Sequence, residues 1–162
     1  MSTGTINIRK AEMRDYSGVS LMMDELHQMH VDARPDLYRA LETRMEEKEF
    51  TELLETDKRY LYVAESSETG LILGYGSAQL SIIEDNSLMV DRKMLYIHEL
   101  VVDTKHRGQG TGKQLIQALI ELGRKLQAHS LELTVSTFNS DAQAFYEQMG
   151  LVVRSSRMEY TL

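Results

Sequence analysis

The sequence predicts a single α/β domain spanning residues 1–162, in which helices flank a mixed, largely antiparallel sheet. Three observations lead to this fold class. Alternating apolar runs recur along the chain, helical apolar spacing separates several of them, and a strand–loop–helix–strand segment at 94–136 has the order of a right-handed parallel crossover. A chain of 162 residues is also long enough to bury one sizeable core.

The first half of the chain is expected to form a strand, helices and a hairpin. Residues 5–11 alternate as a strand does, and Asp15 is a suitable N-cap for the helix that follows. Apolar residues then recur at helical spacing: Val19, Met22, Met23, Leu26 and Met29. A short helix over 33–41 and a glutamate-rich helix ending near Glu55 come next. Two β-rich runs, 59–66 and 71–83, predict an antiparallel hairpin.

The second half is expected to supply the crossover. A strand over 93–102 leads into a glycine-rich loop and a helix with one apolar stripe: Leu115, Leu119, Leu122 and Leu126. Residues 130–136 alternate as the next strand, and a helix over 140–150 ends in a C-cap glycine. Two closing strands are predicted at 151–156 and 157–162.

Composition excludes several classes of protein. The absence of cysteine rules out disulfides, thiolate metal sites and a cysteine nucleophile. No apolar run approaches the ~18 residues of a membrane span, and the first residues lack the apolar centre of a signal peptide. A cytoplasmic protein without a membrane partner is therefore expected. The net charge of −7 argues against a nucleic-acid partner.

Acidic residues concentrate in one segment. From Asp24 to Asp57 there are 11 acidic and 4 basic residues, so the rest of the chain is balanced. Such a segment can draw a cationic substrate toward a nearby site. A solvated helical face that aids solubility explains it equally well.

The glycine-rich loop over 107–113 suggests an anion site, because such loops at helix starts bind phosphates through main-chain N–H groups. Two nucleotide motifs fail here. A P-loop needs Ser or Thr after Gly112-Lys113, where this chain has Gln114. A dinucleotide fold places its glycines after the first strand, whereas this loop comes late in the chain.

Two sequence blocks resemble the GNAT superfamily of acyl-CoA-dependent N-acyltransferases. Arg107-Gly108-Gln109-Gly110-Thr111-Gly112 matches the family's Gln/Arg-x-x-Gly-x-Gly/Ala signature. The segment 139–151 resembles its Asn-x-x-Ala-x-x-Phe-Tyr-x-x-x-Gly-Phe block, with Leu151 in place of the usual phenylalanine. The element order also fits, so the resemblance spans nearly the whole chain.

The resemblance implies a GNAT-like twisted sheet with one splayed parallel strand pair, and acetyl-CoA as acyl donor. Loop amides from Gly108 to Lys113 would face the donor's pyrophosphate at the positive end of a helix dipole. A bulge in the preceding strand would free the main chain of Leu100, Val101 and Val102 to pair with the pantetheine arm. Asn139 matches a coenzyme-contacting position, although helix capping alone also explains it.

Acyl transfer to an amine requires the ammonium to lose a proton and the leaving thiolate to gain one. Tyr146 matches the family's tyrosine that protonates the coenzyme A sulfur; the structural alternative is an aromatic residue that fills the core beside Phe145.

Two neighbouring residues are candidates for the base. His98 matches a position where some family members carry a basic Glu or His, and Glu99 would gain a raised pKa among apolar neighbours. Plain alternation places His98 on the face of Leu100 and Val102 and Glu99 on the other, and a bulge would change that parity. A relay of water to bulk solvent is the third possibility.

Residues 27–39 occupy the region that rims the acceptor pocket in this family, so Asp32, Asp36 and Tyr38 are candidate contacts of the acceptor. His27 and His30 have a metal-compatible spacing but no evident third ligand, and no metal is expected.

The expected function is transfer of acetyl from acetyl-CoA to a primary amine by direct attack in a ternary complex. The acidic segment favours a cationic small molecule such as a polyamine or aminoglycoside. The alternatives are a protein lysine or N-terminal amine, and a non-catalytic acyl-CoA-binding sensor. A homodimer is a family-level expectation.

Overall fold

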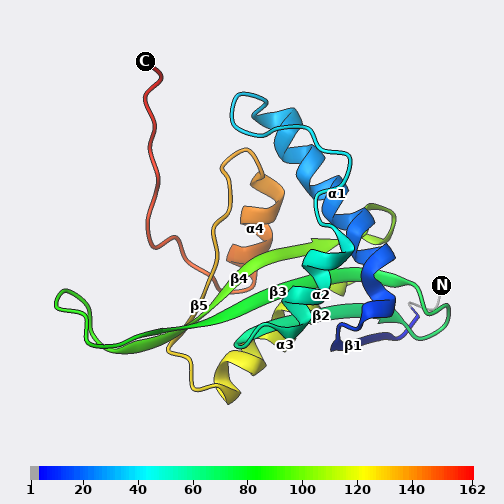
Figure 1. The fold of residues 1–162 in the computed structure, drawn as a ribbon, viewed down its shortest axis with the longest axis horizontal. Helices are drawn as coiled ribbons and strands as arrows, with labels where there is room; N and C mark the ends of the chain where they lie inside the picture. The colour runs from blue at the N-terminus through cyan, green and yellow to red at the C-terminus, as the bar shows by residue number, and fades with distance from the viewer. Residues whose placement is uncertain (1–3) are drawn as a thin grey trace.

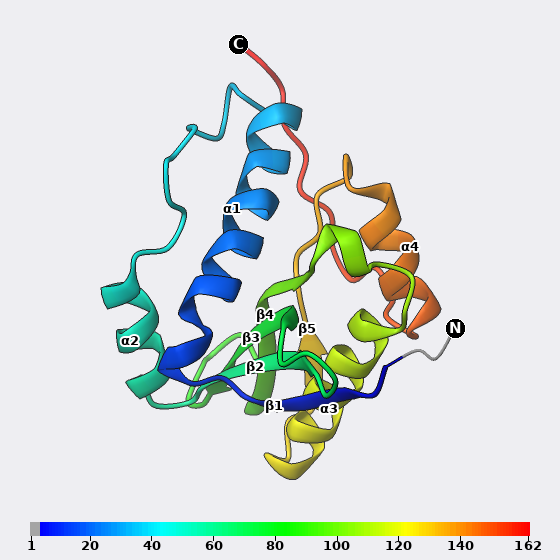
Figure 2. The same ribbon diagram turned by 90° about the vertical axis from the view of Figure 1, so that its right-hand side faces the viewer.

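A five-stranded sheet lies between two layers of helices in the computed structural model, which describes residues 4–162 (Figures 1 and 2). The strand order follows the sequence. Four strands are successive antiparallel neighbours and the fifth is parallel to the fourth: β1 (Ile6–Lys10), β2 (Arg59–Ser66), β3 (Ile72–Ile83), β4 (Arg92–Val102) and β5 (Ser130–Glu132). The predicted α/β class, with a mainly antiparallel sheet and one parallel pair, is confirmed.

Each face of the sheet carries two helices (Figure 2). One face, here called the α1 face, packs against α1 (Tyr16–Ala33) and α2 (Glu47–Glu55). The opposite face, the α3 face, packs against α3 (Thr111–Lys125) and α4 (Ser140–Gln148). Two short 3-10 helices, η1 (Met13–Asp15) and η2 (Thr104–His106), precede α1 and follow β4. Within residues 4–162, no helix has the length and apolar character needed to cross a membrane.

Both faces bury the apolar stripes that the sequence predicted. Val19, Met22 and Met23 of α1 pack on the α1 face, and Ile116 and Leu119 of α3 pack on the α3 face. All five side chains are at most 3% exposed. Full burial of such a side chain contributes about 1.5–3 kcal/mol, so these stripes fix both helix layers against the sheet.

Asp15 begins α1, but its side chain does not cap the helix as predicted. The carboxylate is 3% exposed and accepts two hydrogen bonds of 2.8 Å from the Arg9 guanidinium and one of 2.8 Å from the Glu12 amide. Arg9 also contacts Glu65 of β2 at 2.9 Å. The carboxylate therefore ties β1 to the start of α1 instead of closing the first turn of the helix.

Four predicted elements differ in the structure. Residues 34–46 form a loop in place of the helix expected over 33–41, where Leu37 and Leu41 are half exposed and give a helix no apolar face to bury. The strand expected over 130–136 is paired only at Ser130–Glu132. The closing strands at 151–156 and 157–162 do not form, because this stretch has no strand partner within residues 4–162.

Candidate active site

A bulge interrupts β4 at His98. On the β3 side, Ser77 pairs with Glu99 and the next residue, Ala78, pairs with Ile97, so His98 is the extra residue. A bulge of this kind leaves one residue unpaired and reverses the facing of the strand beyond it.

The bulge places His98 and Glu99 on the same face of the sheet. Leu100 packs on the α3 face, whereas Glu99 shares its face with Val101 of the α1-face core. His98 contacts Gln79, whose neighbours along β3 pack on the α3 face, so Gln79 faces α1. The plain alternation that grouped His98 with Leu100 is therefore wrong, and the alternative with a bulge is the one that the structure contains.

The His98 ring lies at the surface of the α1 face. Its Nε2 is 3.2 Å from Oε1 of Gln79, and its ring meets the Tyr96 ring edge-on at 5.1 Å. Because an amide oxygen only accepts, Nε2 carries the proton in this bond, which leaves Nδ1 of the neutral ring with a free lone pair. Partial burial, and then the positive charge of Arg59, lower the pKa of His98 below its ordinary value. The imidazole is consequently neutral near pH 7 and able to accept a proton.

Glu99 is held in a more enclosed polar group. Its side chain is 18% exposed, and its Oε2 lies 3.4 Å from Nη2 of Arg59, whose Nε donates to Oγ of Ser77 at 2.9 Å. Burial raises the pKa of Glu99, although Arg59 opposes the rise. The pKa is raised as expected. Of the three apolar neighbours expected for Glu99, Val101 shares its face, whereas Leu95 and Ile97 lie on the opposite face.

β4 and β5 separate beyond a short paired stretch. They pair only from Met94 to Tyr96 and from Ser130 to Glu132, after which residues 97–102 of β4 pair with β3 alone. A hydrogen bond of 2.8 Å between the hydroxyls of Tyr96 and Thr134 spans the start of the gap. The main-chain N–H and C=O groups of residues 97–102 on this side are therefore available to an extended ligand, as on the edge strand of a sheet.

The glycine loop at the end of β4 forms the turn that an anion site requires. Gly108 and Gly110 have φ of +77° and +83°, and a Cβ at either would meet no atom within 4 Å among the described residues. Gly110 is the N-cap of α3, so no side chain satisfies the first helical amides, and the amide of Gln114 makes the first bond back to it. Free amides in open space at the positive end of a helix suit a pyrophosphate.

The other residues of the loop motif have different surroundings. Gly112 faces the Phe145 ring, which a Cβ there would approach to 3.4 Å, so this glycine permits close packing of α3 on α4. Thr111 is 1% exposed and faces β3, which leaves only its amide for a ligand. Gln109 and Lys113 are exposed, and Arg107 lies with Nε 3.4 Å from the Val102 carbonyl oxygen.

Tyr146 lies on α4 beside Phe145, with ring centroids 5.3 Å apart, and both rings are half-buried against the α3-face core. Burial raises the pKa of Tyr146 to about 12, so the phenol stays protonated at neutral pH. At the start of the same helix, Oδ1 of Asn139 accepts from the Ala142 amide at 3.2 Å. The predicted capping role of Asn139 is confirmed.

The end of α1 forms an aromatic cluster with the loop after it. The His30 ring lies 5.2 Å from Tyr38 and 5.2 Å from Phe138, edge-on to both. Nδ1 of His30 is 2.8 Å from the Leu26 carbonyl oxygen, and Nε2 of His27 is 2.7 Å from that of Arg39. One ring nitrogen of each histidine is therefore engaged by a main-chain carbonyl oxygen. Residues 4–162 contain no group of three side chains suited to a metal ion.

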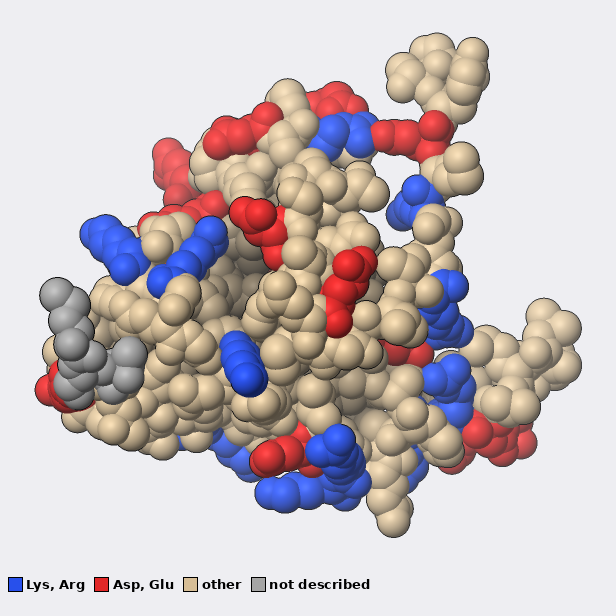
Figure 3. Space-filling model, turned by 180° about the vertical axis from the view of Figure 1, so that it is seen from behind, with Lys and Arg blue, Asp and Glu red and all other residues tan. Residues whose placement is uncertain are grey.

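A cavity of about 700 Å³ opens between α1, η2 and the start of α4. Its lining includes the carboxylates of Glu25, Asp32 and Asp141 and no lysine or arginine. Figure 3 shows acidic side chains gathered over the upper part of one face of the molecule. Asp36 is not part of the lining, because its carboxylate is paired with Arg34 at 2.7 Å.

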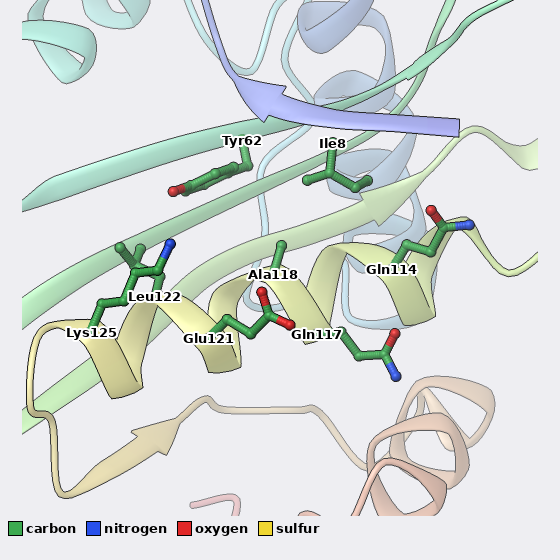
Figure 4. A pocket seen from close by; sticks show the side chains of 8 residues that line it. All are labelled: Ile8, Tyr62, Gln114, Gln117, Ala118, Glu121, Leu122 and Lys125. Carbon is green, nitrogen blue, oxygen red and sulfur yellow. The ribbon is translucent and has the colours of Figure 1, made fainter. Parts of the chain in front are cut away.

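A second cavity, of about 380 Å³, lies between the β1–β2 edge and α3 (Figure 4). Ile8 and Tyr62 reach it from the strands, and α3 supplies the other lining residues. It contains none of the site residues predicted from the sequence, and it is separate from the gap between β4 and β5.

Sequence reasoning missed three side chains around the candidate bases: Arg59 contacts Glu99, Gln79 contacts His98, and Ser77 accepts from Arg59. All three lie in the predicted hairpin. One sign in the sequence was Arg59, a charged residue at the start of a strand that is otherwise largely apolar. Its contact with Glu99 could not be predicted, because it depends on the register between β2, β3 and β4, which no local pattern contains.

The structure contains the splayed parallel pair, the bulged strand and the glycine turn that the resemblance to the acyl-CoA-dependent N-acyltransferases implies. Residues 23–151 match the model of the acetyltransferase (GNAT) family. The chain belongs to this family, whose enzymes use acetyl-CoA as donor.

Curated relatives are matched over part of their length. The chain is 32% identical over 107 residues to N-acetyltransferase 8B of Mus musculus, covering 62% of this chain and 44% of the relative. It is 28% identical over 102 residues to glucosamine 6-phosphate N-acetyltransferase of Arabidopsis thaliana, covering 63% and 64%. The chain thus spans less than two thirds of the length of the curated relatives it matches.

Solved structures match over nearly the whole chain. A mutant of the BH1408 protein from Bacillus halodurans has a TM-score of 0.93 at 31% identity, covering 96% of this chain and 99% of that one. The Arabidopsis thaliana glucosamine-6-phosphate N-acetyltransferase has a TM-score of 0.70 at 23% identity, covering 97% and 98%, and shares the fold.

Proposed function

We propose that this chain transfers the acetyl group of acetyl-CoA to a primary amine by direct attack in a ternary complex. The observation that carries the proposal is the gap between β4 and β5, which ends at the glycine turn and the free amides of α3. An extended thiol ester fits the gap as an added strand, and its pyrophosphate fits the turn.

Donor binding is assigned to the loop and the strand before it. The amides from Gly108 to Lys113 would hold the pyrophosphate, with Arg107 supplying positive charge beside it. The main chain of residues 100–102 would pair with the pantetheine arm, and Asn139 would contact the coenzyme from the start of α4.

Tyr146 is proposed as the acid. A carbon–nitrogen bond forms to the acetyl carbon, the carbon–sulfur bond breaks, and the sulfur leaves as a thiolate that needs a proton. A buried phenol that stays protonated up to about pH 12 is a suitable donor.

His98 is proposed as the base that takes the proton of the incoming ammonium. It is exposed on the bulge and neutral near pH 7, and its Nδ1 is free. Glu99 is the second candidate. Its carboxylate already contacts Arg59 in an enclosed position, which favours an electrostatic role beside the bulge.

The acceptor is proposed to be a cationic small molecule. Three carboxylates that form no ion pair among residues 4–162 line the 700 Å³ cavity between α1, η2 and the start of α4, and this charge attracts ammonium groups. A lysine side chain or an N-terminal amine of a protein would use the same chemistry.

Release of free thiol from acetyl-CoA, measured against a panel of polyamines, aminoglycosides and lysine peptides, tests the proposal. Thiol release that depends on a cationic amine, with an acetylated product, is expected. Tight binding of acetyl-CoA without turnover on any amine would instead favour the acyl-CoA sensor.

A further inference from the structure

Arg59 is a nearly buried cation beside the two candidate bases. It begins β2 on the α1 face, two residues before Leu61 of the α1-face core, and its side chain is only 10% exposed. The proton transfers proposed above do not use it. Because so little of the side chain reaches solvent, its charge acts on neighbouring groups through the protein, where electrostatic interactions are stronger than in bulk water.

Two contacts fix the guanidinium of Arg59. Its Nε donates to Oγ of Ser77 at 2.9 Å, and Ser77 is fully buried. Its Nη2 lies 3.4 Å from Oε2 of Glu99, which is longer than a normal charge-assisted hydrogen bond. The serine is neutral and the carboxylate is only loosely engaged, so the positive charge of Arg59 is incompletely balanced at this point of the sheet.

The register of the sheet brings Arg59 next to the hydrogen bond of His98. Arg59 is the β2 partner of Gln79, and residues opposite each other in this way have Cβ atoms about 4.5–5.5 Å apart. Gln79 in turn accepts from Nε2 of His98 at 3.2 Å. The bulge in β4 completes the arrangement, because it turns His98 to the face on which Arg59 lies. One side chain, that of Gln79, therefore lies between the cation and the imidazole.

A fixed positive charge beside an imidazole opposes protonation of the ring. Partial burial and the charge of Arg59 both lower the pKa of His98. The same charge opposes the rise in the pKa of Glu99 that burial causes. Arg59 therefore favours a neutral ring at His98 and an ionised carboxylate at Glu99. These are the protonation states that a base at the first position and an electrostatic role at the second require.

The other titratable groups on the α1 face near His98 carry no net positive charge. Tyr96 of β4 and Tyr75 of β3 are phenols, which are uncharged near neutral pH. Arg44 of the 34–46 loop forms an ion pair with Glu49 of α2 at 3.9 Å. α1 contributes Asp24, whose Oδ1 accepts from the Arg44 amide at 2.7 Å. Among the described residues, these groups therefore cannot replace the charge at the start of β2.

We propose that Arg59 is a positioning residue for the base: its charge, fixed by Ser77 and Glu99, holds His98 in the neutral form that accepts the proton of the incoming ammonium. The inference rests on the proposed role of His98 in acetyl transfer. Arginine suits this task because a guanidinium stays charged at every pH at which the reaction could be assayed. It follows that Arg59 extends activity toward lower pH.

NMR titration of the His98 ring tests the coupling without any turnover, and the spectrum of His98→Ala assigns its signal among the five histidines. The midpoint should move upward in Arg59→Gln and stay near that of the parent chain in Arg59→Lys, which keeps the charge. Arg59→Gln/Glu99→Gln leaves no unpaired buried carboxylate, so it decides the matter if the single variant does not fold. Its midpoint should also move upward. A midpoint that stays in place in the folded glutamine variants, or an equal rise in Arg59→Lys, would overturn the proposal.

Arg92→Gln is the matched control. Arg92 makes the same kinds of contact, with Oγ of Ser130 at 2.6 Å and Oε1 of Glu132 at 3.2 Å. It precedes His98 by six residues of β4, about 20 Å of extended strand, which exceeds the Debye length of about 8 Å at physiological salt. The His98 midpoint should stay in place in this variant, and a rise equal to that in Arg59→Gln would overturn the proposal.

The pH profile of kcat/KM separates this inference from the proposed function. Its acid limb should move upward together with the NMR midpoint in Arg59→Gln and return toward the position of the parent chain in Arg59→Lys. A purely structural role would lower activity without moving the limb. A limb that stays in place while the midpoint moves would overturn the assignment of His98 as base, and with it the positioning role, whereas the electrostatic coupling between Arg59 and His98 would stand.

Discussion

Nε2 of His98 lies 3.2 Å from Oε1 of Gln79, at the bulge that turns His98 and Glu99 toward the same face of the sheet. This hydrogen bond fixes the proton on Nε2 and leaves Nδ1 as the accepting atom. It separates the roles of two adjacent residues: His98 is exposed and neutral, whereas Glu99 is enclosed and paired with Arg59.

Replacement of the proposed base should change the pH profile of the reaction. The base works when neutral, and its pKa is lowered, so kcat/KM should rise with pH along a limb whose midpoint lies below the ordinary histidine value of about 6.5. His98→Ala should lower kcat by about 10²-fold or more and remove this limb. Glu99→Gln should keep the limb, and loss of the limb in Glu99→Gln alone would assign the base to Glu99.

Tyr146→Phe should lower kcat about 10²-fold and leave the KM for acetyl-CoA nearly unchanged, because the ring is retained and only the proton is lost. With a pKa of about 12, Tyr146 should add no alkaline limb to the profile in the range where the enzyme is assayed. Tyr62→Phe, in the cavity between β2 and α3, is the matched control and should leave the rate unchanged. Equal rates for Tyr146→Phe and the parent chain would remove the acid role.

Gly110→Ala should weaken binding of acetyl-CoA and destabilise the fold by about 1–2 kcal/mol, since φ is +83° at the first step of α3. Gly70→Ala is a close control: its φ is +70°, its Cβ also meets no atom within 4 Å, and it lies in the β2–β3 turn. The two variants should lose similar stability in urea titrations. Only Gly110→Ala should raise the KM for acetyl-CoA, and an equal rise in both would argue against the loop as donor site.

Removal of acidic charge from the cavity should weaken a cationic acceptor selectively. Asp32→Asn and Glu25→Gln should each raise the KM for a polyamine by about two- to fivefold at low salt, as expected for a partly solvated charge pair. The KM for acetyl-CoA should stay constant. Asp36→Asn is the control, because Arg34 already neutralises that carboxylate. A larger rise in KM for Asp36→Asn than for the cavity variants would indicate that the acceptor binds outside the cavity.

The pair between Arg9 and Asp15 should make folding stability depend on pH. Burial alone would raise the pKa of Asp15, but hydrogen bonds from Arg9 and the Glu12 amide hold it below its ordinary value. The contribution of the carboxylate is therefore complete above a pH of about 3.9 and is lost as the pH falls through the lowered pKa. Asp15→Asn should cost about 3–5 kcal/mol in urea unfolding at pH 7. A difference between variant and parent that stays constant on acidification would contradict this assignment.

Local patterns predicted the glycine turn but not the side chains that surround the candidate bases. The glycine loop follows from residues adjacent in sequence, and Gly108 and Gly110 adopt the left-handed backbone that such a loop requires. The facing of Glu99 could not be predicted, because one extra residue in β4 reverses the parity and its position depends on pairing with β3. Gly112 shows the same limit, because the motif gives no sign that this glycine faces the Phe145 ring.

The two closing strands show a different limit. Alternation in 157–162 predicts a strand that the structure does not contain, because a strand forms only where a neighbour supplies hydrogen bonds. Among residues 4–162 that neighbour is absent. The segment 34–46 is a loop in place of the helix predicted over 33–41 for a related reason, because the side chains of Leu37 and Leu41 have no apolar surface to pack against.

The most direct test of the central claim is a single reaction of acetyl-CoA with a polyamine in which free thiol and acetylated amine are both quantified. Direct transfer predicts equal amounts of the two, no thiol release without the amine, and a fall of about 10²-fold in the rate of both products in Tyr146→Phe. Thiol release that does not depend on the amine, or binding of acetyl-CoA with no product, would contradict the account.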